Sequence, residues 1–587
     1  MPMSRGSVAE RARLFWFAAR CGLRGTFGRL NAHPLLRWRF TPAKADRLMM
    51  APKDLRTADP TRASEIYAGR FAFAGKIVVC DGRSPFEMEP PSDEWAENLF
   101  GFGWLRHLRA AESGITRANA RALVDEWITL QALWDSTAWR SDVVARRIMS
   151  WLSQAPMVLH EVDTRFYRRF LRNLTRQVRF LRGTLGSARD GLPRLQGLIA
   201  LTYASLCMKG QARLVKGTTR RLARELERQI LPDGGHISRN PGALIELLLD
   251  LLPLRQAFSS NNIPPPPPLL NAIDRMMPML RFFRHGDGNF ALFNGMGPTS
   301  GDLLAAVLYY DDARGTPVAN APHSGYQRLQ AESTVLLAET GLPPPIGVSQ
   351  EAHAGCLSFE LSSKQNRIVV NCGLPATSRA SWRHVARGTA AHSTATFNEA
   401  PSCRVLGGTW LRRLVGTPII AGPTEVPVAR QDRDDGVVLR ASHDGYADAF
   451  GVLHQRTWRL SPDGRRLDGE DVFAPARGES LPAGRGDAFA VRFHLHPGVK
   501  ASRLNDGYGA MLMLPNREVW TFDSYEDPVT LEESVYLAGS EGPRRAVQLV
   551  IHGRARRVPR VCWTFAQADP SAPAARRGGE KEPELPL

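Results

Sequence analysis

The first half of the chain repeats apolar and polar positions with the spacing of amphipathic helices. In Asn119–Leu130, for example, Leu123, Trp127 and Leu130 share one helical face. The connections between such segments are short, and no repeat of fixed period occurs. The pattern predicts an α/α array, either an open solenoid or a toroid closed on itself. The predicted helices are Asn119–Leu130, Asp142–Leu152, Thr164–Leu185, Leu195–Met208, Thr218–Ile230 and Leu269–Arg281.

A polar loop, Leu231–Pro241, interrupts this array. It contains Pro-Asp-Gly-Gly, a turn-forming sequence. Asn240 followed by Pro241 predicts a helix start, with Asn240 as the N-cap and Pro241 as the first helical residue. His236 and Arg239 then lie on the loop that leads into this helix, within reach of a cleft.

Two further segments of the first half carry a local prediction. Trp95–Ala111 holds a dense aromatic cluster, which predicts a core and, as the alternative, a sugar-stacking cleft. His285–Gly295 predicts a turn, a short strand and an exposed polar end.

From about residue 325 to 565 the pattern changes to short strands separated by Gly, Pro and Asp turns. Leu357–Leu361 alternates as a strand does, and Arg367–Asn371 is a β-branched run that ends at a Cys-Gly turn. His353 and His392 therefore lie beside strands, separated by a hairpin and a loop. About 240 residues of this pattern predict a large β-sandwich rather than one immunoglobulin unit.

Together these patterns predict an α+β multidomain protein, an N-terminal α/α toroid followed by a C-terminal antiparallel β-sandwich. The predicted divisions are a basic, helical lead-in at 1–60, the toroid at 61–320, the sandwich at 321–566 and a disordered tail at 567–587.

The formal net charge of +18 comes mostly from arginine. A balance this basic favours acidic partners: a polyanionic glycan, an anionic membrane or nucleic acid. The alternative is an arginine-rich composition with solvated faces. Nucleic-acid binding rests on charge alone, because no basic-aromatic motif accompanies it, so no specific nucleic-acid partner is predicted.

The N-terminus predicts a basic amphipathic helix over residues 8–30. Such a helix either packs on the protein or touches a membrane surface or a partner. No apolar run approaches the roughly 20 residues that span a bilayer, and no signal-peptide cleavage site follows cleanly. The compartment stays open between the cytoplasm and the periplasm or cell envelope.

The seven cysteines are scattered and form no Cys-x-x-Cys pair. This spacing argues against a disulfide framework and against a zinc knuckle, and it predicts reduced thiols.

Three short blocks resemble the heparinase II/III-like family. In the β-half, that family opens with a histidine-rich segment ending in Leu-Ser-Phe-Glu, then a strand ending in Asp-x-Gly, then Arg-x-Thr-x-x-His-Asn-Thr. The matching residues here are Glu351, His353, Gly355, Leu357–Glu360, Asn371, Gly373, Arg387, Thr389, His392 and Thr394.

The loop before the predicted Asn240 helix also resembles the family's Asp-Gly-Gly-His-x-Glu-Arg-Ser-Pro. This chain departs from the family in three places. Glu351 replaces the first histidine of the β-half motif. The Tyr-His pair falls on Ala243 and Leu244, and Gly191–Arg194 stands where many relatives have Gly-Asn-His. The matching loop residues are Asp233, Gly234, Gly235, His236, Arg239 and Pro241.

The resemblance implies a lyase that cleaves an acidic, uronate-containing polysaccharide by β-elimination. Such a reaction neutralises the uronate carboxylate, removes the C5 proton and protonates the leaving oxygen. By this likeness His236 and His353 transfer protons, and Arg239 and Asn240 hold the carboxylate. Tyr326, at the domain junction with Tyr309 and Tyr310, is the candidate catalytic tyrosine.

Glu351 and Arg387 are further candidate substrate-binding residues. The resemblance also implies a structural zinc site at His353, Asn371 and His392, where neutral asparagine is a poorer ligand than carboxylate; no other cofactor is expected. The alternative for both histidines is a hydrogen-bonded role that ties strands together. The alternative for the whole chain is a non-catalytic glycan-binding or envelope-assembly relative.

Overall fold

The computed structural model describes residues 8–32, 40, 47–130, 137–311, 315–375, 380–407, 409–478, 480–481 and 486–568. The predicted disordered tail therefore lies outside the described residues from position 569 onward. All seven cysteines are described, and all are free thiols.

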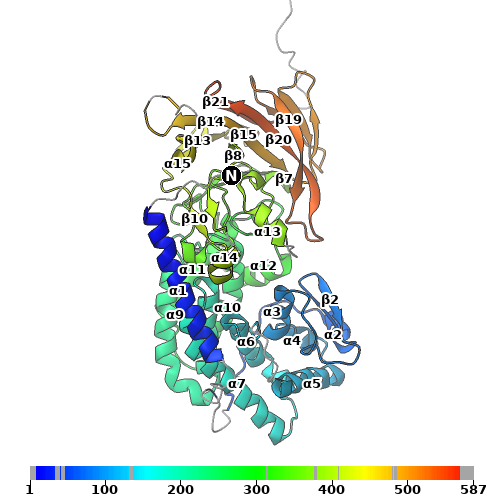
Figure 1. Ribbon diagram of the computed structural model, residues 1–587. Coiled ribbons are helices and arrows are strands. Elements are labelled where there is room, and N and C mark those ends of the chain that lie inside the picture. The colour runs from blue at the N-terminus through cyan, green and yellow to red at the C-terminus, as the bar shows by residue number, and fades with distance from the viewer. Residues whose placement is uncertain are drawn as a thin grey trace, which may run out of the picture.

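A layered set of helices forms the lower part of the molecule in Figure 1. The predicted helices are present, with ends that differ from the expectation by a few residues. The helices are α2 (Pro60–Tyr67), α3 (Asp93–Gly101), α4 (Leu105–Ala110), α5 (Gly114–Leu130), α6 (Ser141–Val158), α7 (Thr164–Thr184), α8 (Leu192–Cys207), α9 (Val215–Gln229), α10 (Gly242–Ser260), α11 (Pro267–Phe282) and α12 (Gly301–Leu308). Two short strands, β1 (Arg70–Phe73) and β2 (Lys76–Val79), form a hairpin beside α2.

The start of α10 differs by one residue from the prediction. The helix begins at Gly242, and Pro241 precedes it as the cap. Asn240 still contributes, because its Oδ1 accepts the Gly242 N–H at 2.8 Å. The side chain therefore caps the helix from one position further out than predicted.

Two antiparallel sheets pack face to face in the second half of the chain, as the sequence predicts. One sheet has the order β11-β12-β13-β14-β21-β18-β17-β16. The other has the order β19-β20-β15-β7-β6-β5-β4-β3, with β8 pairing to β15. The strands are β3 (Asn320–Ala321), β4 (Tyr326–Ala331), β5 (Thr334–Glu339), β6 (Phe359–Ser363), β7 (Asn366–Val370), β8 (Ala395–Phe397), β11 (Val428–Arg433), β12 (Gly436–Tyr446), β13 (Val452–Leu460), β14 (Arg466–Pro475), β15 (Ala488–Leu495), β16 (Lys500–Arg503), β17 (Gly509–Met513), β18 (Val519–Asp523), β19 (Val529–Tyr536), β20 (Arg544–Arg554) and β21 (Arg560–Gln567).

Two hydrophobic cores hold these parts together. The core of the helical part contains the aromatic cluster of α3 and α4, so the predicted core role of that cluster is confirmed. This core also takes in Tyr326, Val335 and Leu337 from the first strands of the sandwich. A separate core lies between the two sheets and includes Trp458, Trp520 and Trp563. The outer face of β4 and β5 thus packs against helices.

Helix α1 (Val8–Ala32) lies along the side of the molecule, dark blue in Figure 1. It packs against α7 and the short η2 turn (Leu185–Ser187) of the helical part, and against α14 (Thr409–Val415) and β10 (Ile419–Ala421) of the second half. Within the described part of the chain, no helix is both long and apolar enough to cross a bilayer.

Candidate functional site

Arg239 lies at the junction between the helices and the sandwich and is buried. Its Nε donates to the Ser324 carbonyl at 2.8 Å, and its Nη atoms donate to carbonyls that flank the β4–β5 hairpin. Nη1 also forms an ion pair with Glu339 at 3.0 Å. Burial alone lowers the pKa of the guanidinium, but the Glu339 carboxylate raises it above its ordinary value. The carbonyls that accept from the Nη atoms belong to Gly325, Gly341 and Leu342.

Asn294 and Glu339 connect Arg239 to the histidines of the β-half. The Asn294 amide donates to Glu339 Oε1 and to the Tyr326 hydroxyl, both at 2.8 Å. Asn294 Oδ1 accepts the main-chain N–H of His353 at 3.2 Å. The predicted exposed polar end at His285–Gly295 is therefore wrong at Asn294, which is buried because its amide joins three partners at the junction.

Tyr326 is buried in this network. Its hydroxyl donates to the Arg239 carbonyl at 2.6 Å, and its ring lies 4.9 Å below the Arg239 guanidinium carbon. Burial raises the pKa of the phenol above its ordinary value. The side chain is thus neutral and fully engaged in holding Arg239 and Asn294.

The imidazoles of His353 and His392 form a hydrogen-bonded pair, named here the histidine relay. His392 Nδ1 lies 2.8 Å from the Gly388 carbonyl, which only accepts, so Nδ1 carries the proton. The unprotonated Nε2 of His392 then accepts from His353 Nδ1 at 3.0 Å. His353 Nε2 is left as a buried lone pair without a hydrogen-bond partner among the described residues.

Both imidazoles of this relay are neutral at physiological pH. Burial lowers the pKa of His392 to about 4 and that of His353 well below its ordinary value. A carboxylate approaches the pair closely, because a Cβ on Gly355 would lie 2.8 Å from both Glu339 Oε2 and His392 Cδ2. Only glycine at position 355 allows this packing.

Two of the three residues of the predicted zinc site, His353 and His392, lie against each other in this arrangement. The two imidazoles bond to each other, and Asn371 Oδ1 accepts the Ser393 N–H at 3.0 Å. No cluster of three or more His, Cys, Asp and Glu side chains that could hold a metal occurs among the residues that the structure describes. Zinc binding stays a prediction.

His236 belongs to a different set of contacts. The Ser238 N–H donates to its Nδ1 at 3.2 Å, so the proton lies on Nε2, which donates to Gln229 Oε1 at 2.9 Å. Burial lowers the pKa of His236 to about 4. The side chain holds the loop to the end of α9 and has no hydrogen bond to the histidine relay.

The other candidates divide between buried and accessible positions. Arg387 is buried, and its guanidinium donates to the carbonyls of Ser349, Ala352 and Thr417. Glu351 is exposed and Asn240 half-buried. These two meet at Gly295, where a Cβ would lie 2.9 Å from the Glu351 carbonyl and 3.3 Å from Asn240 Nδ2.

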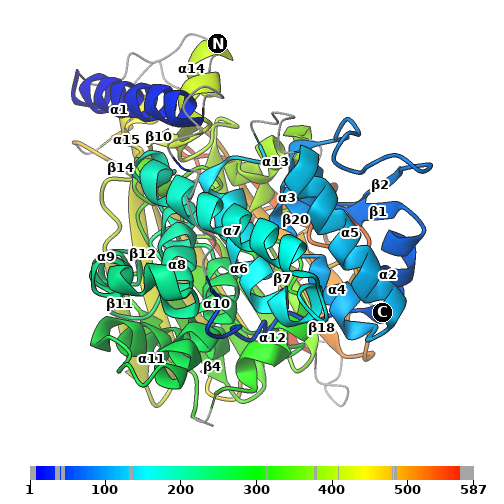
Figure 2. The same cartoon turned by 90° about the horizontal axis from the view of Figure 1, so that it is seen from below.

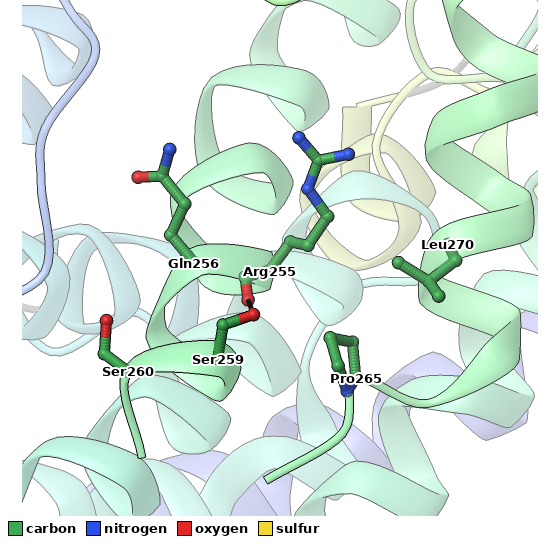
Figure 3. Close-up of a pocket in the computed structure, with 6 residues that line it drawn as sticks. All are labelled: Arg255, Gln256, Ser259, Ser260, Pro265 and Leu270. Carbon is green, nitrogen blue, oxygen red and sulfur yellow. Dashed lines mark hydrogen bonds between the residues drawn. The ribbon is translucent and has the colours of Figure 1, made fainter. Parts of the chain in front are cut away.

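Two hollows in the described surface lie away from these residues. The larger, of about 510 Å³, lies between the end of α10 and the start of α11, and its lining includes Arg255, Gln256, Pro265 and Leu270 (Figure 3). The smaller, of about 30 Å³, lies among Arg56, Arg146 and Asp250. Neither contains a candidate proton-transfer residue.

Sequence reasoning named His236, Asn240, Tyr326 and His353 as catalytic candidates and Arg239 as a candidate for substrate binding. The structure joins Arg239, Tyr326 and His353 through Asn294 and Glu339. Neither connecting residue was singled out. A carboxylate at the end of the apolar strand Thr334–Glu339 was the one available signal, because a buried acid needs a partner. The catalytic and substrate-binding roles of the candidates stay predictions.

Comparison with known proteins gives three kinds of match. Residues 313–564 match the family model described as Heparinase II/III-like, C-terminal. The FtsZ-localized protein C of Caulobacter vibrioides (strain NA1000 / CB15N) is 30% identical over 537 residues, which cover 90% of this chain and 91% of that protein.

Solved structures share the architecture at low sequence identity. A crystal structure of heparinase III aligns with a TM-score of 0.69 at 13% identity, covering 91% of this chain and 88% of that one. Heparan sulfate lyase HepC from Pedobacter heparinus aligns with a TM-score of 0.57 at 14% identity, covering 96% and 88%. At such identities the likeness establishes the fold, a helical toroid with a β-sandwich.

Proposed function

Because the chain belongs to the heparinase II/III-like family, we propose that it uses this polysaccharide-lyase scaffold as a non-catalytic protein docked on an anionic membrane surface. This is the envelope-associated alternative to a lyase. The observation that carries it is the outer face of α1.

The outer face of α1 presents large apolar side chains to solvent. Phe15, Trp16 and Leu23 are 69%, 73% and 72% exposed. Trp16 and Leu23 lie seven residues apart and share a face with Arg13 and Arg20, both exposed. Aromatic and leucine side chains flanked by arginine are typical of helices that lie in the interface of an anionic bilayer. Burying each such side chain contributes about 1.5–3 kcal/mol.

The candidate site supports a non-catalytic role. A uronate carboxylate needs an arginine with free N–H groups, ideally two in parallel. The guanidinium groups of Arg239 and Arg387 are instead directed to main-chain carbonyls and, for Arg239, to Glu339. Tyr326 and His236 are likewise engaged with protein groups.

The relative named FtsZ-localized protein C supports a site of action. The two chains align over nine-tenths of their length. We therefore propose that the docked protein lies with the division machinery, at the inner face of the envelope.

Sedimentation with vesicles tests the docking. The chain should bind vesicles that contain phosphatidylglycerol, and the variant Phe15→Ser, Trp16→Ser, Leu23→Ser should bind more weakly by roughly 1,000-fold or more. Tyr309→Ser is the matched control, because Tyr309 is 85% exposed but follows α12. Equal binding by the triple variant and the unaltered chain would overturn the proposal.

A retained lyase activity is the second candidate, and the unpartnered Nε2 of His353 favours it. A neutral imidazole whose Nδ1 proton is held by His392 is suited to accept a proton at Nε2. Incubation with uronate polymers tests this, since β-elimination yields an unsaturated uronate that absorbs in the ultraviolet. Turnover that is lost in His353→Gln but kept in His160→Gln would support the lyase, and no absorbance change with any uronate polymer would exclude it.

A further inference from the structure

Helix α7 presents a row of arginines to solvent. Seven of its 21 residues are arginine, and it contains no aspartate or glutamate. Its apolar residues face inward, and Phe166 and Phe170 are both buried. Four arginines are exposed and have no ion pair with any described residue: Arg165, Arg168, Arg172 and Arg182.

The spacing of these residues places them on one face. Steps of three and four residues come within about 60° of a whole helical turn and the step of ten within about 80°, so the four arginines lie within a sector of about 100°. Solvated helical faces ordinarily intersperse both signs of charge, which limits self-repulsion. Helix α9 is also basic, yet it carries Glu225 and Glu227 among its cations. Because it contains no acidic side chain, the α7 row produces a local positive field.

The helix that carries the row packs against α1. α1 also packs against η2, which follows α7 directly. Arg189, exposed after η2, is close enough to Cys21 of α1 to act on its thiol electrostatically. Figure 2, the view from below, shows α7 uncovered across the helical part, with α1 near one of its ends.

We propose that the α7 arginine row is the electrostatic half of the membrane contact and binds the phosphate headgroups of anionic lipids, while α1 supplies the apolar half. This inference rests on the proposed docking by α1. Lipid is favoured over nucleic acid because the neighbouring exposed side chains are those that enter a bilayer, and because the three phenylalanines of α7 (Phe166, Phe170 and Phe180) are buried and offer no surface for base stacking.

Each cation near an anionic membrane surface contributes on the order of 1 kcal/mol, so the row sets how strongly binding depends on anionic lipid. Reversing its charge should weaken binding to vesicles of phosphatidylcholine and phosphatidylglycerol by roughly 100-fold or more, and leave the weak binding to pure phosphatidylcholine unchanged. Added salt should weaken binding of the unaltered chain but hardly affect that of the variant. The variant is Arg165→Glu, Arg168→Glu, Arg172→Glu, Arg182→Glu.

A matched control variant distinguishes an effect of the α7 arginine row on binding from an effect of the net charge of the chain. The control variant carries the same change in charge on exposed residues of η3 (Lys209–Leu214) and α9, and should bind within about threefold of the unaltered chain. Circular dichroism melting checks that both variants fold. The control substitutions are Arg213→Glu, Lys216→Glu, Arg220→Glu and Arg224→Glu.

The binding of the α7 and α1 variants distinguishes failure of the arginine-row proposal from failure of the docking proposal. If the α7 variant binds as the unaltered chain does while the α1 triple variant does not, the arginine row is excluded and docking stands. If the α1 triple variant binds normally, both proposals fall. If the α7 and α9 variants weaken equally, net charge alone explains the binding. If the chain binds a DNA or RNA oligonucleotide through α7 and no vesicle, the partner is nucleic acid.

Discussion

At the scale of single residues, arginine is used in two opposite ways. Arg239, Arg328 and Arg456 are buried and donate to main-chain carbonyls, as Arg456 does to Leu357 and Ser393. The planar group with its five donors can satisfy several loop carbonyls at once, which lysine cannot do. Part of the positive charge therefore lies in the interior, and the remainder, such as the α7 row, faces solvent.

Buried histidines make stability depend on pH. The pKa of His236 is lowered from 6.5 to about 4, so between these values the unfolded chain binds a proton that the folded chain does not. Stability is therefore full above pH 6.5 and falls as the pH drops toward 4, by about 3 kcal/mol for this residue.

Urea unfolding at a series of pH values measures this effect. His236→Gln keeps a donor and an acceptor without a titrating group, so its free energy of unfolding should fall less steeply with acid. The exposed His160→Gln is the control. The same slope in His236→Gln as in the unaltered chain would contradict the assignment.

At the scale of elements, periodicity predicted the helices better than their ends. The sequence predicted where the helix after Asn240 starts, and α10 then continues through Pro253 to Ser260, since Leu251, Leu252 and Leu254 are buried around this proline. The sandwich was predicted, but not its strand order. β14 pairs with β21, whose residues lie about 95 positions later, and no local pattern encodes a pairing at that separation.

The β14–β21 pairing depends on a glycine. A Cβ on Gly469 would lie 2.1 Å from Trp563 Cζ2, and the Trp563 indole is fully buried and donates to Asp471 at 2.8 Å. Gly469→Ala should therefore lower the free energy of unfolding by about 1–3 kcal/mol, measured by urea titration. Gly301→Ala is the control, because nothing lies within 4 Å of its Cβ position at the start of α12. A loss of unfolding free energy no larger than that of the control would show that the strands can shift to accommodate the Cβ without loss of stability.

At the scale of the whole molecule, the two halves meet through buried charge. Arg239 reaches Glu339, and His285 Nε2 lies 3.0 Å from Glu360 Oε2. The motif residues Arg239 and Glu360 were visible in the sequence, but their partners come from segments about 75–100 positions away, so the sequence indicated the candidate residues and not the network. Arg239 and Glu360, which lie in the motifs that predicted a catalytic site, form contacts between the two halves of the chain.

Removing one partner of the Arg239–Glu339 ion pair should destabilise the fold. Arg239→Met leaves Glu339 buried without its cation and should lower the free energy of unfolding by about 3–5 kcal/mol. The double variant Arg239→Met, Glu339→Leu should recover part of this loss, because no charge is then buried alone. Arg255→Met, at the open hollow, is the control. A double variant no more stable than the single one would contradict a direct coupling between the two residues.

Helix α1 touches both halves of the chain: α7 and η2 on one side, α14 and β10 on the other. If this helix is the point of attachment to a surface, any tension on the attached molecule is divided across the seam between the halves instead of pulling on one of them. A force on the attached helix would then act on the helical half and on the second half at the same time. Drag from a moving partner would press the two halves together or draw them apart.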